Sequence, residues 1–134
     1  MQKIEHIGIA VKDLDQSEKL YTQLLGTPPY KRVTVESEGV ITSFFRVGSN
    51  KIELVQSSTP DGVIARFIDK KGEGIHHIAY GVTDIKAEMT RLRDAGFRLL
   101  SEEPKKGADN KWVCFLHPKS SGGVLVELCQ ERQD

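Results

Sequence analysis

The sequence predicts an α+β protein built from two paired βαβββ modules, and three observations support this. The segment 6–13, HIGIAVKD, returns at 77–84 as HIAYGVTD. The segment 52–56, IELVQ, returns at 126–130 as VELCQ. Each copy of the first segment is followed by apolar residues at helical spacing. A long period that is present only twice indicates duplicated modules rather than a solenoid, which needs three or more units.

The first module is predicted to begin with a strand over 4–11, which places His6 on one face with two small residues, Gly8 and Ala10. The opposite face is bulky enough to pack on a helix. Asp13 is a suitable N-cap, and Gly26 is a suitable stop. Strands are expected at 31–36, 40–47 and 51–56. The helical stripe that we expect to lie in the core is Leu14, Ser17, Leu20, Tyr21, Leu24 and Leu25.

The second module repeats this order. His77 shares its face with Ala79 and Gly81, and Asp84 is the matching N-cap. The expected strands are 98–101, 112–117 and 124–129. The apolar stripe of the expected helix is Ile85, Met89, Leu92 and Ala95, ending at Gly96.

Between the modules, 60–68 is predicted to be a helix capped by Thr59 or Asp61, followed by a flexible joint over 70–74. The expected organisation is therefore one domain over 1–134. Module 1 covers about 1–58, the linker helix about 59–74 and module 2 about 75–134.

Composition narrows the classes of function. Lysine plus arginine and aspartate plus glutamate balance at 19 each, so no whole-chain field attracts nucleic acid or an anionic membrane. No apolar run reaches the roughly 18 to 20 residues of a membrane helix, and no signal-peptide pattern is found. We therefore expect a cytoplasmic protein. Its two cysteines, Cys114 and Cys129, are expected to be reduced and buried.

Each module offers one histidine and one glutamate on its strands, namely His6, Glu53, His77 and Glu127. Each glutamate lies between two apolar neighbours and projects from the opposite face, and a partly buried carboxylate needs a partner. Imidazoles and carboxylates suit a divalent ion such as Co²⁺, Mn²⁺, Ni²⁺, Zn²⁺, Fe²⁺ or Mg²⁺, and the ligand types do not choose among them. Four ligands leave a six-coordinate ion two open positions, which is typical of a reactive site.

The other candidate ligands are weaker. His76 should point away from the face of His77, and His117 ends a strand before Pro118. Cys129 shares the expected face of Glu127, but Val55 stands at its place in the first module. We therefore expect Cys129 to be at most part of a pocket wall.

Several motifs resemble the vicinal oxygen chelate (glyoxalase/bleomycin resistance) superfamily and, within it, the methylmalonyl-CoA epimerase family, over nearly the whole chain. They are HIGIAV at 6–11, FRVG at 45–48, KIEL at 51–54, GEGIHHIA at 72–79, FLHPK at 115–119 and GGVLVEL at 122–128. The resemblance implies a curved mixed sheet around a metal site, helices outside, and a homodimer.

The resemblance also implies an activity. His6, Glu53, His77 and Glu127 would hold the metal, and the substrate would be an acyl-CoA thioester, methylmalonyl-CoA. Removal of its C2 proton gives an enediolate, which a metal chelated by two substrate oxygens stabilises. Epimerisation needs an acid and a base on opposite faces of C2, and Glu127 matches one of them.

The second proton-transfer group is not carried over by the resemblance. Some family members have a glutamate where this chain has Thr42, a residue without useful basicity. Glu36 or Glu38 from the preceding loop, or a water relay through Thr42 or Ser43, are the alternatives. Candidate contacts for the phosphates of CoA are Lys70, Lys71, Lys105, Lys106 and Lys111.

Two other functions remain open. A lactoylglutathione lyase of the glyoxalase I type shares the metal pattern, but its opening strand usually carries an arginine near the first ligand, and Gly8, Ile9 and Ala10 follow His6 here. A non-enzymatic protein that sequesters small molecules needs the paired modules but not four metal ligands.

Overall fold

The computed structural model describes residues 1–133, whose eight strands and three α-helices form two compact units. The first unit is His6–His76, and the second unit combines Met1–Glu5 with the chain from His77 onward. The predicted α+β class with a mixed sheet is confirmed, since parallel and antiparallel strand pairs occur in each unit. Among the described residues no helix has the length and apolar character needed to cross a membrane.

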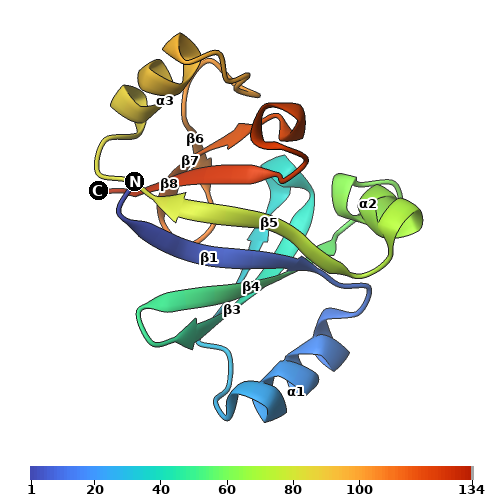
Figure 1. Ribbon diagram of the computed structural model, residues 1–134. Helices are drawn as coiled ribbons and strands as arrows, with labels where there is room; N and C mark the ends of the chain where they lie inside the picture. The colour runs from blue at the N-terminus through green and yellow to red at the C-terminus, as the bar shows by residue number, and fades with distance from the viewer. Residues whose placement is uncertain (134) are drawn as a thin grey trace. The chain divides into compact units, whose positions relative to one another are not determined.

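In the first unit the strand order is β2-β3-β4-β1, with β1 parallel to β4 and the other neighbours antiparallel (Figure 1). The predicted strands are confirmed to within a few residues. The elements are β1 (Lys3–Ala10), α1 (Leu14–Leu25), β2 (Lys31–Val35), the 3₁₀ turn Glu36–Glu38, β3 (Val40–Val47), β4 (Asn50–Ser57) and α2 (Val63–Lys71).

Helix α1 begins and ends where the sequence predicts. The Asp13 carboxylate accepts the backbone N–H of Gln16 at 3.1 Å, and Gly26 adopts a left-handed φ of 74° that closes the C-terminus. Its buried face packs Leu14, Tyr21 and Leu25 against the sheet.

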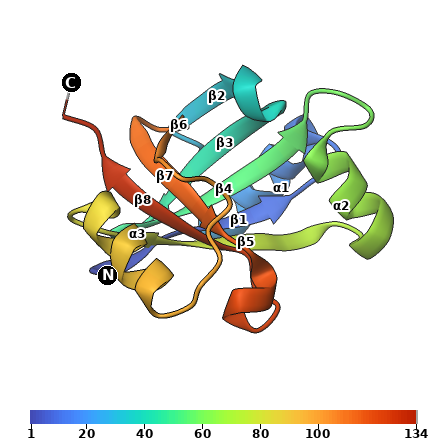
Figure 2. The ribbon, with the colours of Figure 1, turned by 90° about the horizontal axis from the view of Figure 1, so that it is seen from above.

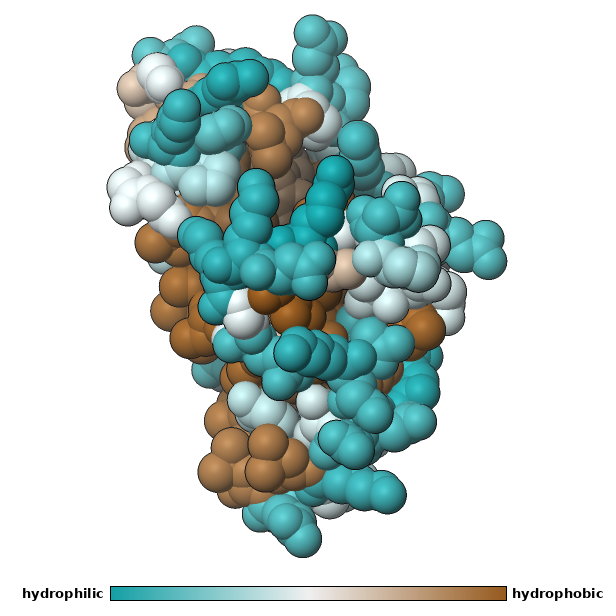
Figure 3. Space-filling view, turned by 90° about the vertical axis from the view of Figure 1, so that its right-hand side faces the viewer, coloured by the Kyte–Doolittle hydropathy of each residue, from teal (hydrophilic) through white to brown (hydrophobic). Residues whose placement is uncertain are grey.

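Two residues of the expected core stripe of α1 were placed wrongly. Leu20 and Leu24 are 60% and 69% exposed. The sheet covers a narrower arc of the helix than the apolar stripe occupies, so these two side chains lie outside the contact. Figure 3 shows hydrophobic side chains exposed among hydrophilic ones on the side of the molecule that it displays.

Helix α2 differs from its prediction at both ends. It starts at Val63, and its N-cap is Gly62, so neither Thr59 nor Asp61 caps it. The Ser57 hydroxyl donates to the Thr59 carbonyl at 2.6 Å, which holds this segment as a turn. At the other end the predicted flexible joint is partly helix, because Lys70 and Lys71 form the last turn of α2. Figure 2 shows α1 and α2 beside the strands of the first unit.

The second unit has the strand order β5-β8-β7-β6, again with one parallel pair, β5 and β8. Helix α3 buries Ile85, Met89 and Leu92 against β7 and β8, as the apolar stripe predicts, whereas Ala95 of that stripe is the exposed C-cap. The elements are β5 (Gly74–Gly81), α3 (Ile85–Asp94), β6 (Lys105–Gly107), β7 (Lys111–Leu116), the 3₁₀ turn Pro118–Ser121 and β8 (Val126–Glu131).

The prediction of a strand at 98–101 is wrong. Only Leu99 makes a bridge there, to Leu116, and the strand at this place in the order is β6. The guanidinium of Arg93 donates to the carbonyls of Ser101 and Glu102 at 3.2 and 2.7 Å, so these carbonyls are bound to α3 instead of to a neighbouring strand.

Candidate active site

In the first unit the parallel pairing of β1 and β4 brings a histidine to a glutamate. Gly8 lies beside Glu53 in the register and adds no side chain next to it. The His6 Nε2 and Glu53 Oε1 atoms are 3.2 Å apart, and the two side chains are 6% and 9% exposed. Phe44, the β3 partner of Glu53, contacts the His6 ring edge-to-face at 6.4 Å. The imidazole is thus held between an aromatic ring and a carboxylate.

The second unit repeats this arrangement. Ala79 on β5 is the register neighbour of Glu127 on β8. His77 Nε2 and Glu127 Oε1 are again 3.2 Å apart, with the side chains 6% and 9% exposed. Phe115, the β7 partner of Glu127, contacts the His77 ring edge-to-face at 5.8 Å. The sequence repeat therefore corresponds to a repeat in geometry, down to the aromatic residue.

Each pair has the donor set and spacing of metal ligands. Two ligand atoms bound at right angles, with metal–ligand distances near 2.1 Å, lie about 3 Å apart, close to the separation in both pairs. A carboxylate this deeply buried needs a positive or hydrogen-bonding partner, and a histidine that ligates a metal is neutral. The residues of each pair are therefore fit to hold a divalent ion.

Thr42 lies on the same face of the sheet as Glu53. It is the register partner of Val55, two residues past Glu53, and two residues before Phe44, the partner of Glu53 itself. Thr42 is 1% exposed, and its hydroxyl donates to the Val33 carbonyl at 3.4 Å.

The other candidates for the second proton-transfer group lie elsewhere. Ser43 points to the opposite face, where its hydroxyl donates to the Glu18 carboxylate of α1 at 2.5 Å, so a relay through Ser43 is excluded by its orientation. Glu36 and Glu38 are exposed in the 3₁₀ turn before β3.

The two remaining histidines make contacts other than those of the His–Glu pairs. His76 contacts the Phe67 ring edge-to-face at 4.8 Å, and His117 Nδ1 accepts the backbone N–H of Lys119 at 3.1 Å. Both cysteines are buried, and neither forms a disulfide. Strand alternation puts Cys129 on the face of Glu127, whereas Cys114 packs on the other face with α3.

One buried charge cluster was missed in the sequence. Lys111 and Glu5 are 6% and 4% exposed, their charged atoms are 3.9 Å apart, and Lys111 Nζ also donates to Glu131 at 3.3 Å. The prediction that Lys111 contacts phosphate at the surface is therefore wrong. The signal was available in the alternation of strand 111–116, which puts Lys111 on one face with Val113 and Phe115. The other candidate lysines, Lys70, Lys71, Lys105 and Lys106, are exposed.

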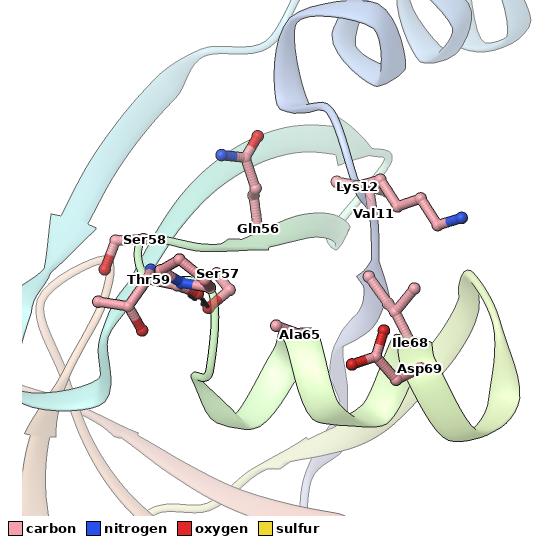
Figure 4. Close-up of a pocket in the computed structure, with 10 residues that line it drawn as sticks. Val11, Lys12, Gln56, Ser57, Ser58, Thr59, Ala65, Ile68 and Asp69 are labelled. Atoms are coloured by element: carbon pink, nitrogen blue, oxygen red, sulfur yellow. Dashed lines mark hydrogen bonds between the residues drawn. The ribbon is translucent and has the colours of Figure 1, made fainter.

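A groove of about 440 Å³ opens at the end of β4 in the first unit (Figure 4). Its floor is apolar, with Val11, Ala65 and Ile68, and Lys12 and Asp69 stand at its rim. Ile64 and Ile68 of α2 pack against Ala10 and Val55, which lie further along the face of His6 and Glu53. This packed layer separates the groove from the His–Glu pair.

Comparison with known proteins identifies the relatives of the chain. Residues 5–115 match the family described as the Glyoxalase/Bleomycin resistance protein/Dioxygenase superfamily. The human mitochondrial methylmalonyl-CoA epimerase is 42% identical over 96% of this chain and 73% of its own length. An ethylmalonyl-CoA/methylmalonyl-CoA epimerase of Cereibacter sphaeroides is 42% identical over 96% of this chain and 97% of its own.

Solved structures agree with this. A variant of the Streptomyces coelicolor methylmalonyl-CoA epimerase in complex with 2-nitronate-propionyl-CoA superposes with a TM-score of 0.95 at 33% identity, over 99% of this chain and 96% of its own.

Proposed function

Because the chain belongs to the glyoxalase/bleomycin resistance protein/dioxygenase superfamily, also called the vicinal oxygen chelate superfamily, we propose that it is a metal-dependent epimerase of methylmalonyl-CoA. The observation that carries the proposal is the duplicated, buried His–Glu pair with the same 3.2 Å separation in both units. The identity to named epimerases over nearly the full length supports this substrate.

We propose that His6, Glu53, His77 and Glu127 together hold one divalent ion. Two neutral imidazoles and two carboxylates suit Co²⁺, Mn²⁺, Ni²⁺, Zn²⁺ or Mg²⁺, and these remain equal candidates. When bound, such an ion supplies positive charge where negative charge accumulates on the substrate oxygens as the C2 proton leaves.

Two different groups of the chain are needed to move the proton, one on each face of C2. Glu127 accepts the C2 proton on one face, because it is a buried carboxylate with little water to compete for that proton. A return of the proton to the opposite face requires a second group, since Glu127 alone tends to restore the starting epimer. Thr42 lies on the face of Glu53, and we assign to its hydroxyl the role of orienting a water molecule that gives a proton to this face. That water regains a proton from solvent, and Glu127 gives up to solvent the proton that it accepted.

The deciding experiment is proton NMR of methylmalonyl-CoA in D₂O with metal-loaded protein. The expected result is loss of the C2 proton signal together with conversion of one epimer to the other, and both should stop after chelation of the metal. No exchange at C2 by metal-loaded protein would refute the proposal. Turnover of the methylglyoxal–glutathione adduct in a parallel assay would instead indicate a glyoxalase, and protein purified without metal and without exchange would indicate sequestration.

Two further expectations concern the environment of the protein. The two buried cysteines form no disulfide, which fits a reducing compartment, so we propose a cytoplasmic location. We also propose a homodimer, for which the exposed leucines of α1 offer apolar surface. Light scattering after size exclusion tests the second expectation, and a monomeric mass would contradict it.

A further inference from the structure

We propose that Ala79, Val113 and Cys129 form the wall that receives the C2 alkyl group of the substrate, and that Cys129 limits the size of that group. This inference rests on the proposed epimerase function. It addresses which branched malonyl thioesters the site accepts. None of the three residues is a proposed metal ligand.

The wall is adjacent to the group that would take the C2 proton. Cys129 follows Glu127 by two residues on β8, about 7 Å along the strand and on the same face. Val113 on β7 is the register partner of Cys129, and Ala79 on β5 is the partner of Glu127. The three side chains form one buried apolar cluster, separate from the core under α3. An alkyl group on C2 needs apolar contacts within a few ångströms of the proton that leaves.

The corresponding positions in the first unit do not offer such a wall. There Val55 stands in place of Cys129, and it is covered by Ile64 and Ile68 of α2. The second unit carries its helix, α3, on the other face of its sheet. The apolar residues past Glu127 therefore have no helix of their own unit over them among the described residues, and Ala79 and Cys129 have small side chains.

A buried ion pair lies at the far end of this wall. Lys111 precedes Val113 by two residues on the same face of β7 and pairs with Glu5, and both charges are buried. A longer alkyl chain that passes Cys129 reaches this ion pair and places apolar atoms against it without offering a hydrogen bond, which is unfavourable. A methyl group stops short of the pair.

The test compares methylmalonyl-CoA with ethylmalonyl-CoA as substrates of the metal-loaded protein, using exchange of the C2 proton as the readout for both. Cys129→Ala enlarges the wall by removing the thiol, and Cys129→Leu reduces the space. Cys114→Ala is the matched control, because Cys114 is equally buried and forms no disulfide but lies on the α3 face.

We expect Cys129→Ala to raise the ratio of kcat/KM for the ethyl over the methyl substrate about tenfold, and Cys129→Leu to lower it by at least as much, since one methylene in an apolar pocket is worth roughly 10- to 200-fold. Cys114→Ala should leave the ratio unchanged. Val113→Ala, which widens the same wall, should shift the ratio in the direction of Cys129→Ala and provides the test if a Cys129 variant does not fold.

An unchanged ratio in folded Cys129→Ala or Val113→Ala overturns the inference and leaves the epimerase proposal intact. An equal shift in Cys114→Ala also overturns it, because the effect would then be one of general packing. Absence of exchange with both substrates in the unmodified protein contradicts the proposed function itself.

Discussion

The side-chain oxygen of Gln130 accepts the backbone N–H of Ile85 at 2.7 Å, at the first residue of α3. The first unit contains the same bond at the same length, from Leu14 at the start of α1 to Gln56. Each glutamine follows a site glutamate on the same strand, Glu127 or Glu53. The bond thus fixes the start of each helix to the strand that carries the carboxylate.

Gln130→Met should lower the free energy of unfolding by about 1 to 3 kcal/mol, because it leaves a partly buried backbone N–H of Ile85 without its acceptor. Urea unfolding followed by circular dichroism measures this change. Gln23→Met on the exposed side of α1 is the control and should change the stability by less than about 0.5 kcal/mol. Equal stability of Gln130→Met and the unmodified protein would show that water replaces this bond at no cost.

Glu127→Gln and Glu53→Gln are the same substitution at two positions with equal burial and equal distance to a histidine. If Glu127 transfers the proton, Glu127→Gln should lower the rate of C2 exchange by about 10²- to 10⁴-fold. Glu53→Gln should retain most of the exchange, because an amide oxygen still binds a cation. Single-turnover exchange at saturating metal measures both rates, and equal losses would argue against a catalytic role confined to Glu127.

His77→Ala should abolish stoichiometric metal binding and C2 exchange together, because it removes one of the four proposed ligands. Elemental analysis of the purified variant gives the metal content directly. His117→Ala is the matched control, since its ring accepts only a local backbone N–H, and metal content should be retained. Full metal content in His77→Ala would remove this histidine from the site.

Glu18 should contribute stability that disappears in acid. Burial alone raises the pKa of the Glu18 carboxyl, but hydrogen bonds from Arg32 and Ser43 outweigh this and hold its pKa below the ordinary value. A lowered folded-state pKa gives stabilisation that is complete above the unfolded-state pKa, near 4.3, and is lost as the pH falls through the folded-state value. Glu18→Gln should therefore be less stable than the unmodified protein at pH 7, and the difference should shrink below about pH 4.

Urea unfolding at several pH values measures this difference. Glu102→Gln, at an exposed site, is the control and should show no comparable pH dependence. A stability difference for Glu18→Gln that is constant across this range would mean that packing rather than charge is responsible.

The sequence was sufficient where local chemistry decides the structure. Asp13 and Asp84 mark helix starts because their carboxylates accept backbone N–H groups two to three residues inside the helix. Strand β3 was predicted with its bounds at Val40 and Val47. The repeat also predicted that each module carries one histidine and one glutamate on its strands, and these residues lie on β1, β4, β5 and β8.

The predictions failed where contacts between residues distant in sequence decide the structure. The carbonyls of Ser101 and Glu102 accept hydrogen bonds from Arg93, and local secondary-structure propensity does not predict this contact. The pairing of Lys111 with Glu5 joins two strands far apart in the chain, and a lysine near a turn is usually solvated. Strand alternation indicates the burial of Lys111, but no local pattern indicates that Glu5 is its partner or that Arg93 binds these carbonyls.

Strands β1 and β5 each contribute residues to both compact units. Lys3–Ala10 crosses the boundary after Glu5, and Gly74–Gly81 crosses it after His76. A continuous strand cannot melt in one unit and remain ordered in the other without breaking in its middle. Heat should therefore unfold the chain in one cooperative calorimetric transition, and a separately expressed half would lack part of the strand that its own unit needs.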